Sequence, residues 1–155
     1  MKISIVAVGT RMPQWSEQAV QEYLERFPRD FEVTLRQVRP EPRRQQPVER
    51  ILQAESVRLR EAFAPADHVI ALDERGTDWS TQRLAQQIGA WREASEHVAF
   101  VIGGPDGLDE SIKSAARMRL RLSSLTLPHA LARVLLTEQL YRVWSILANH
   151  PYHRA

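Results

Sequence analysis

The sequence predicts an α/β fold in which a parallel β-sheet carries helices on both of its faces. Short β-branched apolar runs alternate with segments of helical periodicity along the whole chain, which is the pattern of a parallel sheet. The run at 3–8 is almost continuously apolar, as expected for a strand that is covered on both faces. A chain of 155 residues without an internal repeat or a long linker is typical of one domain, so we expect a single domain over 1–155.

The first half of the chain is expected to hold two strands and two helices in alternation. The segments in order are a strand at 3–8, a helix at 14–27, a strand at 31–35 and a helix at 47–63. The strands have continuous or alternating apolar residues, and the helices have apolar residues three or four positions apart. Tyr23 and Phe27 continue the inner face of the first helix, and Pro28 is expected to end it.

The second half continues the alternation with shorter elements. The expected segments are a strand at 69–72, a helix at 80–93, a strand at 98–102, a short helix at 109–116, a short strand at 120–122 and a final helix from 128 to about 147. Ser80 is a good N-cap residue because its hydroxyl accepts a hydrogen bond from a free backbone N–H group. Pro128 is expected to open the final helix, since proline is tolerated in the first turn.

The final helix is apolar on nearly every side. Its apolar residues spread almost all round a helical wheel: Leu131, Val134, Leu135, Leu136, Leu140, Val143, Trp144 and Leu147. A helix that is apolar on most sides is buried on most sides, and the core of a 155-residue chain rarely surrounds a terminal helix. We therefore predict a homodimer that buries part of this helix. Glu138 and Arg142, four positions apart, predict an ion pair that is either partly buried or at the surface.

The charged residues are unevenly distributed along the chain. The net charge is only +2, but residues 36–60 and 117–155 sum to +4 and +5 around a middle segment that sums to −6. All but two of the 21 basic residues are arginine, which suits phosphate and base contacts or reflects codon usage. The proline-rich segment 36–50 is expected to form an exposed arginine-rich loop, either an arm that follows RNA phosphates or a merely solvated loop.

The composition disfavours several classes of protein. The absence of cysteine excludes a disulfide framework, a cysteine nucleophile and a thiolate zinc site. Neither GxSxG nor HExxH occurs, and His150 and His153 have no further ligands nearby, so we expect no metal site. No apolar run approaches the roughly 20 residues of a membrane-spanning helix, and we expect a cytoplasmic protein with no membrane partner.

Three loops are the candidate ligand-binding segments. Parallel sheets bind ligands beyond the carboxyl ends of their strands, which selects the loops at 72–78, 103–108 and 123–128. The glycine-rich turn at 103–107 either brings the backbone close to a ligand or makes a plain tight turn. The segment 122–129 alternates apolar and hydroxyl residues. It indicates either an apolar slot in which backbone amides bind a flat polar ligand such as adenine, or a short edge strand.

Several motifs together make the sequence recognisable. They lie in the same order and spacing as in one family: Val6-Ala7-Val8-Gly9-Thr10, Leu72-Asp73, Ile102-Gly103-Gly104-Pro105-Asp106-Gly107-Leu108, Leu122–His129 and Asn149–Arg154. The sequence resembles the ribosomal large-subunit pseudouridine N3-methyltransferases, the RlmH group of the SPOUT superfamily, over essentially the whole chain. The resemblance implies a homodimeric α/β knot fold, with a deep C-terminal trefoil knot and a knotted cofactor-binding part at about 67–155.

The resemblance also implies a cofactor and a substrate. S-adenosylmethionine would bind in the knot, without a metal, and the substrate would be a pseudouridine of 23S rRNA within the assembled 70S ribosome. Carried onto this chain, the cofactor-binding residues would be Leu72, Gly103, Leu122, Ser123, Ser124, Leu125, Thr126 and Leu127. These residues belong to the same loops that the parallel sheet selects.

The chemistry of the transfer points to residues near the C-terminus. The nucleophile is a ring nitrogen that carries an acidic imide proton. A general base would remove this proton, and a cationic group would stabilise the imide anion that remains. His153 is the first candidate base, with Tyr152 and Arg154 orienting it or compensating charge, and His129 is the second. Arg142 is expected to contact RNA phosphate or to hold the tail through Glu138. The sequence leaves two alternatives open. The proton could instead pass to water, and the tail could act either in its own subunit or in the partner's site.

Two other functions compete with the methyltransferase. One is a non-catalytic protein on the same fold that binds RNA or the ribosome. The other is a protein that binds a small anion through the turn at 103–107. Stabilisation by S-adenosylmethionine distinguishes the enzyme from the non-catalytic protein.

Overall fold

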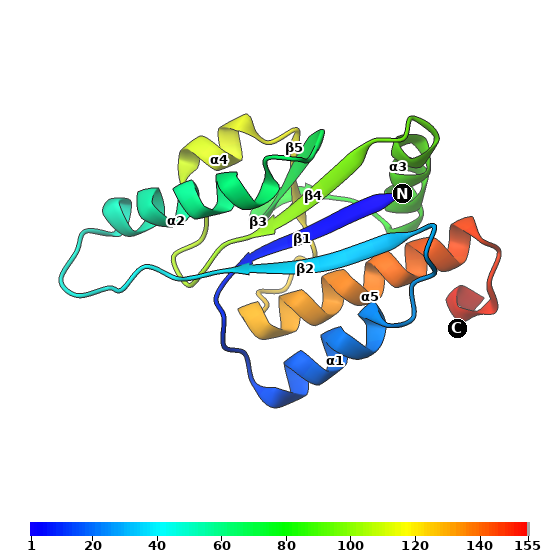
Figure 1. Cartoon of the computed structure of the whole chain (residues 1–155), viewed down its shortest axis with the longest axis horizontal. Coiled ribbons are helices and arrows are strands. Elements are labelled where there is room, and N and C mark those ends of the chain that lie inside the picture. The colour runs from blue at the N-terminus through cyan, green and yellow to red at the C-terminus, as the bar shows by residue number, and fades with distance from the viewer. Residues whose placement is uncertain (155) are drawn as a thin grey trace.

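The computed structural model describes residues 1–154, so only Ala155 of the expected domain lies outside the described part. In chain order the elements are β1 (Lys2–Val8), α1 (Gln14–Leu24), β2 (Glu32–Val38), α2 (Val48–Phe63), β3 (His68–Asp78), α3 (Thr81–Glu93), β4 (His97–Ile102), α4 (Glu110–Ala115), β5 (Met118–Arg121), α5 (His129–Leu147) and the 3-10 helix η1 (Pro151–Arg154). All four strand pairs are parallel, and the strand order is β2-β1-β4-β3-β5 (Figure 1). The predicted parallel α/β fold is confirmed.

The sheet lies between two layers of helices. Helices α3 and α5 pack on one face, with α1 against α5, and helices α2 and α4 cover the other face (Figure 1). The central strand β1 divides its side chains between the two cores because successive side chains of a strand point to opposite faces. Ile3, Ile5 and Ala7 belong to the core under α3 and α5, whereas Val6 and Val8 belong to the core under α2 and α4.

Two predicted boundaries in the first half were wrong. Helix α1 ends at Leu24 instead of continuing to Phe27, whose ring packs in the following turn on Phe31 and Tyr141. Strand β2 continues to Val38, beyond the predicted end at residue 35, because it pairs with β1 in register over seven residues. As an edge strand it has polar side chains in its second half, and these interrupt the apolar alternation on which the prediction depended.

The predicted loop at 72–78 is largely part of strand β3. This strand begins at His68, and its register with β5 shifts between Leu72 and Thr77. The charged residues in this interval interrupt the pattern of apolar side chains, so the sequence indicated a loop. Gly76 lies close to the β5 backbone, since a Cβ atom at that position would be 2.8 Å from the carbonyl carbon and oxygen of Arg119. Strand β5 is also displaced from the predicted 120–122 and covers Met118–Arg121.

The predicted caps and the final helix agree closely with the structure. Ser80 Oγ accepts a hydrogen bond from the Arg83 backbone N–H, at 3.1 Å, and Pro128 immediately precedes α5. Helix α5 packs against α1, α3 and the sheet, so the chain itself covers more of this helix than expected. The homodimer remains a prediction. Among residues 1–154, none of the helices is both long and apolar enough to cross a membrane.

Candidate functional site

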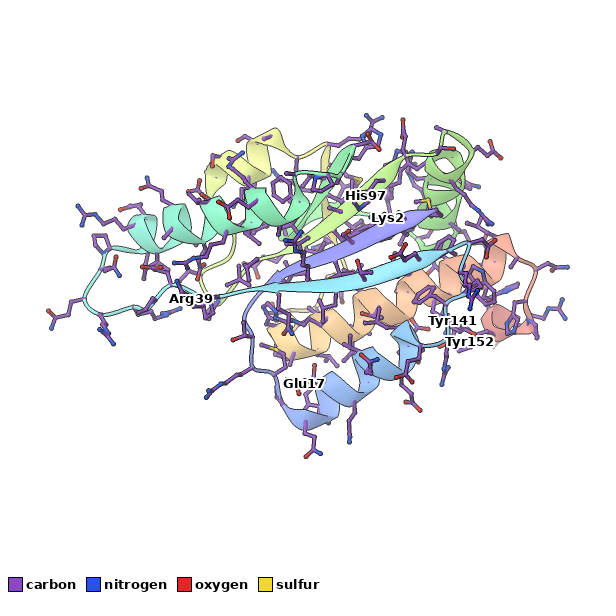
Figure 2. The ribbon with its side chains drawn as sticks, viewed as in Figure 1. Lys2, Glu17, Arg39, His97, Tyr141 and Tyr152 are labelled. Carbon is purple, nitrogen blue, oxygen red and sulfur yellow. The ribbon has the colours of Figure 1, made fainter. Side chains whose placement is uncertain are left out.

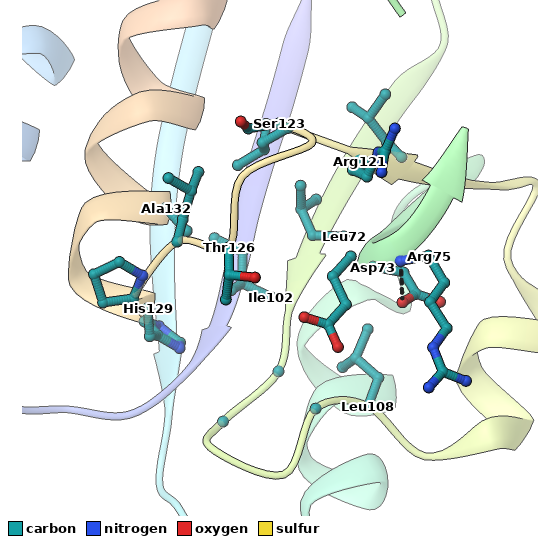
Figure 3. Close-up of a pocket in the computed structure, with 18 of the residues that line it drawn as sticks. Leu72, Asp73, Arg75, Ile102, Leu108, Arg121, Ser123, Thr126, His129 and Ala132 are labelled. Carbon is teal, nitrogen blue, oxygen red and sulfur yellow. Dashed lines mark hydrogen bonds between the residues drawn. The ribbon is translucent and has the colours of Figure 1, made fainter. Parts of the chain in front are cut away.

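A cavity of about 590 Å³ lies at the carboxyl ends of β4 and β5 and beside the middle of β3, where the register with β5 shifts. Its walls come from three segments that are far apart in the sequence: 72–75, 102–108 and 120–129 (Figure 3). The three predicted loops therefore meet at one cavity. Most of the residues expected to bind a cofactor line it: Leu72, Gly103, Leu122, Ser123, Leu125, Thr126 and Leu127. Ser124 is the exception, since it is exposed and is not part of the cavity wall.

The glycine-rich segment forms a tight turn in the wall of the cavity. The Gly107 N–H donates to the Gly104 carbonyl at 2.9 Å, and Gly107 has a φ of +82°, a conformation that favours glycine. A Cβ atom at Gly103 would lie 2.4 Å from the Gly107 carbonyl oxygen, so no other residue fits there without a shift of the backbone. The tight-turn and ligand-loop interpretations are therefore compatible, because the compact turn exposes its backbone to the cavity.

The segment between β5 and α5 forms the opposite wall as an irregular loop. The alternative prediction of a short edge strand was wrong, since the last strand ends at Arg121 and the following residues form no strand. A hydrogen bond of 2.9 Å from the Leu125 N–H to Ser123 Oγ holds the loop in a bend. The Leu125 side chain is 75 % exposed, which is unusual for a large apolar residue beside a cavity.

Charged groups of both signs surround the rim of the cavity. Asp73, Glu74 and Asp106 line it together with Arg75 and Lys113. The Arg75 backbone N–H donates to Asp73 Oδ1 at 3.0 Å, shown as the dashed line in Figure 3. Arg121 also lines the cavity, so the acidic and basic side chains are equal in number, and a positively charged group of a ligand would be favoured only next to a carboxylate.

The arginine-rich loop is shorter than the predicted 36–50, because β2 continues to Val38 and α2 begins at Val48, and the loop contacts the glycine turn. Arg43 forms an ion pair of 2.8 Å with Asp106, although the Arg43 side chain is 59 % exposed. At the base of the loop, the buried Glu55 accepts a hydrogen bond of 3.0 Å from the Glu41 backbone N–H. Burial raises the pKa of Glu55, and the nearby Asp106 carboxylate raises it further. The loop and the cavity are thus continuous parts of one surface.

His129 lies at the start of α5, in the cavity wall (Figure 3). Its Nε2 accepts a hydrogen bond of 2.8 Å from Arg133 Nε, and its ring also bonds to the Gly103 backbone. Burial lowers the pKa of His129 to about 4, and the positive charge of Arg133 acts in the same direction. His129 is therefore neutral near neutral pH, and its Nε2 lone pair is already used by Arg133.

Arg133 is a buried cation that joins the ends of three elements. Its side chain is only 2 % exposed. Besides His129, it donates to Gln37 Oε1 at 2.7 Å and to the carbonyl oxygens of Val8 and Gly9 at 3.3 and 2.7 Å. The sequence does not predict this role, because an arginine within a basic segment is usually a solvated residue. Its apolar helical neighbours were the available signal of burial.

The C-terminal residues form a second cluster at the far end of α5. The Tyr152 hydroxyl donates to Glu138 Oε1 at 3.0 Å, and the ring packs edge-on against Tyr141 at 4.7 Å (Figure 2). The predicted pair is confirmed, since Arg142 contacts Glu138 at 2.7 Å and lies over the Tyr152 ring. Burial raises the pKa of Tyr152, and hydrogen bonds to Tyr23 and Glu138 add to this, so its phenol stays protonated.

Two further residues of this cluster were missed by the sequence analysis. The Tyr23 hydroxyl lies 3.1 Å from the Tyr152 hydroxyl, although the two residues are 129 positions apart. Ser145 is fully buried and binds both His150 and His153. The Tyr23 contact is long-range, so no local pattern could indicate it. The Ser145 contacts lie five and eight positions along the chain, but they depend on how the tail folds back on α5.

The structure does not bring the C-terminal cluster to the cavity of the same chain. His129 is at the beginning of α5, whereas Tyr152, His153 and Arg154 follow its end. The 19 residues of α5 span about 28 Å at 1.5 Å per residue. Figure 1 shows the two ends of α5 at opposite ends of the sheet. Within residues 1–154, no group of three acidic or histidine side chains is placed to hold a metal ion.

Comparisons with known proteins agree with this architecture. The family model described as "Predicted SPOUT methyltransferase" matches residues 1–153. The chain is 52 % identical to a Ribosomal RNA large subunit methyltransferase H of Variovorax paradoxus (strain S110), over 99 % of each chain. It is also 52 % identical to the protein of that name in Burkholderia thailandensis, over the full length of both.

A solved structure supports the fold independently of sequence. A probable methylase family protein from Haemophilus influenzae Rd KW20 superposes with a TM-score of 0.62 at 16 % identity, and the match covers 97 % of this chain and 69 % of that one. At this identity the likeness concerns the fold alone. The family model and the full-length relatives decide the matter: the chain belongs to the SPOUT methyltransferase family.

Proposed function

We propose that this protein transfers a methyl group from S-adenosylmethionine to N3 of a pseudouridine in the 23S rRNA of the assembled 70S ribosome. The family membership supports methyl transfer, and the name shared by the relatives supports large-subunit rRNA as the substrate. The observation that carries the proposal is the cavity at the carboxyl ends of β4 and β5 and the middle of β3, where the three candidate segments meet.

The cavity suits the chemistry of S-adenosylmethionine. Its volume of about 590 Å³ is in the range of small-ligand sites, which are mainly apolar with a few polar groups. Leucines and backbone groups suit a flat adenine ring, and Asp73 or Glu74 suits a positive charge. The proposed binding residues are Leu72, Gly103 and the loop 122–127. When bound, the cofactor supplies a methyl group whose bond to sulfur breaks as the new bond to nitrogen forms, which leaves a neutral thioether.

We further propose that each active site combines the cavity of one subunit with the C-terminal tail of the other. A tail that begins about 28 Å from its own cavity cannot act there, as the length of α5 indicates. The exposed Leu125 and the half-buried Leu131, Val134 and Leu135 offer an apolar surface beside the cavity for a partner subunit. We also propose that the cofactor-binding part covers residues from about 67 to 155 and contains a deep trefoil knot.

The tail residues then act on the RNA. His153 takes the imide proton of the target base, and the electron pair left on N3 forms the new bond to the methyl carbon. Tyr152 is held neutral against Glu138 and positions the tail. Arg154 is exposed and suits an RNA phosphate. Arg142 holds Glu138 and can present its remaining N–H groups to RNA. His129 supports the cavity wall, because its Nε2 is already bonded to Arg133.

The decisive experiment is transfer of a labelled methyl group from S-adenosylmethionine to 70S ribosomes, with free 23S rRNA as the comparison. We expect label on one pseudouridine of the 70S particle, little label on free 23S rRNA, and none with His153→Ala. Label on another nucleotide or on protein would overturn the proposed substrate and leave the cofactor in place. A protein that S-adenosylmethionine does not stabilise against heat would be a non-catalytic member of the fold.

A further inference from the structure

We infer that Ser145 is a positioning residue that fixes the neutral His153 ring with its proton on Nδ1 and its lone pair on Nε2. This inference rests on the proposed function, in which His153 accepts the proton of the target base. Ser145 does not touch the substrate. It determines which of the two ring nitrogens is the base, and it does so from within the core of the same subunit.

The Ser145 hydroxyl has three partners. It donates to the His150 carbonyl oxygen at 2.8 Å. It lies 2.9 Å from His153 Nδ1 and accepts a hydrogen bond of 3.1 Å from the His153 backbone N–H. A serine hydroxyl has one proton to donate and two lone pairs to accept with, so these three contacts use its full capacity.

The direction of each bond follows from the partners. A carbonyl oxygen can only accept, so the single hydroxyl proton of Ser145 points to His150. The hydroxyl oxygen must then accept from His153 Nδ1, which therefore carries a proton. In a neutral imidazole that leaves the lone pair on Nε2. Within residues 1–154, His153 Nε2 has no hydrogen-bond partner, and the ring is partly exposed.

The neighbouring His150 is held in the opposite form. Its Nδ1 accepts a hydrogen bond of 3.2 Å from the Tyr152 backbone N–H, so its proton lies on Nε2 when the ring is neutral. The His150 ring also packs on Trp144, with 5.1 Å between ring centroids. Of the two tail histidines, only His153 therefore presents an unprotonated nitrogen at its outer edge.

The backbone around Ser145 makes this arrangement rigid. Just after the end of α5, Asn149 lies in the left-handed region, at a φ of 54°. The Asn149 N–H bonds to Ile146 and the His150 N–H bonds to the Ser145 carbonyl, at 3.2 and 2.8 Å, which is a Schellman motif. Ser145 thus contacts His150 through both its carbonyl and its hydroxyl. The fully buried serine connects the last turn of α5 to the tail helix η1.

The consequence for the reaction is a defined proton path. The N3 proton of the base moves to His153 Nε2, the N3 electron pair forms the bond to the methyl carbon, and the resulting imidazolium keeps its Nδ1–H bond to Ser145. The imidazolium then releases the Nε2 proton to solvent, which restores the starting form. Because Nδ1 stays protonated throughout, neither step requires Ser145 to move.

The tautomers can be measured without cofactor or ribosome. Ring nitrogens of ¹⁵N-histidine in the full protein have distinct NMR shifts when protonated and unprotonated, and the His153→Asn variant assigns the resonance. At a pH where the rings are neutral, we expect the Nδ1–H form for His153 and the Nε2–H form for His150. An Nε2–H form at His153 in the unmodified protein would overturn the inference.

Ser145→Ala tests the role in catalysis. A neutral histidine side chain in water prefers the Nε2–H form, so His153 should shift toward it, and kcat should fall by about tenfold, part of the 10²–10⁴-fold that a positioned base contributes. Binding of S-adenosylmethionine should change by less than about twofold, since Ser145 is fully buried behind the tail and does not line the cavity. Ser56→Ala is the matched control, because Ser56 is also buried and its Oγ donates only to the Gln53 carbonyl, at 2.7 Å.

The outcomes separate this inference from the function on which it rests. An unmodified protein that transfers no methyl group contradicts the proposed function, whereas the NMR measurement still tests the tautomer. Ser145→Ala with an unchanged His153 tautomer and unchanged kcat contradicts the inference alone. If Ser145→Ala does not fold, the tautomer of His153 in the unmodified protein still supports or overturns the inference.

Discussion

At the scale of single residues, the most unusual side chain is Arg133. A buried cation normally has a carboxylate partner, since removal of a charge from water is costly. Each of the three guanidinium nitrogens of Arg133 donates a hydrogen bond, but the partners are neutral: an imidazole, an amide and two carbonyl groups. Burial lowers the pKa of Arg133, but a guanidinium remains charged at neutral pH. Burial and, to a smaller extent, this charge keep His129 neutral, and Arg133 anchors the wall of the cavity through its hydrogen bonds.

The pairing of His129 with Arg133 makes stability depend on pH. The pKa of His129 is about 4 in the folded protein and 6.5 in the unfolded chain. The unfolded state therefore takes up a proton first, and stability falls as the pH drops from 6.5 toward 4. We expect a shallower decrease of Tm over this range for His129→Asn. Scanning calorimetry measures the Tm of both proteins at each pH. The difference between their Tm values above pH 7 gives the pH-independent cost of the substitution. Equal slopes in both proteins would contradict the prediction.

At the scale of elements, the glycine turn between β4 and α4 has the strictest steric requirement. A Cβ atom at Gly103 would lie 2.4 Å from the Gly107 carbonyl oxygen. We expect Gly103→Ala to cost about 1–3 kcal/mol through overpacking and to weaken binding of S-adenosylmethionine at least tenfold. Thermal unfolding and calorimetric titration measure the two effects.

A glycine in a helix provides the matched control. A Cβ atom at Gly89, in α3, would meet only the flexible end of Leu147, at 3.2 Å. Gly89→Ala should therefore leave cofactor binding unchanged and alter stability by less than about 1 kcal/mol. Full cofactor affinity in Gly103→Ala would show that the turn does not form the binding wall.

The elements were predictable where their signal is local. The β-branched run of β1, the Ser80 cap and the Pro128 start of α5 agree with the structure, because each depends on residues adjacent in sequence. The irregular middle of β3 was not predictable. Its charged residues resemble a loop, and only pairing with β5 extends the strand to Asp78.

At the scale of the whole molecule, the separation between cavity and tail is the main feature. Each lies at one end of α5, so a complete site requires two subunits under the proposed function. This arrangement predicts complementation. A purified heterodimer of a Gly103→Ala subunit and a His153→Ala subunit contains one site with an intact cavity and an intact tail from different subunits.

We expect this heterodimer to have about half of the methyl-transfer rate of the unmodified dimer, since one of its two symmetric sites is complete. Each homodimeric variant should be inactive in the same assay. Co-expression with two affinity tags isolates the heterodimer, and labelled methyl transfer to 70S ribosomes measures its rate. An inactive heterodimer would mean that each tail serves its own subunit.

The sequence by itself determined the fold class, the loops that meet at the cavity and the chemical groups available in the tail. Hydrophobic periodicity and turn residues are local properties, and parallel strands carry their loops to one edge of the sheet. Only the tertiary structure decided that Arg133 is buried against His129, that Ser145 holds His153, and that the tail is remote from its own cavity. His129 and Arg133 are only four residues apart and Ser145 and His153 eight, but the groups that bury Arg133 come from β1 and β2, and the tail folds back on α5 only in three dimensions, which local sequence patterns do not encode.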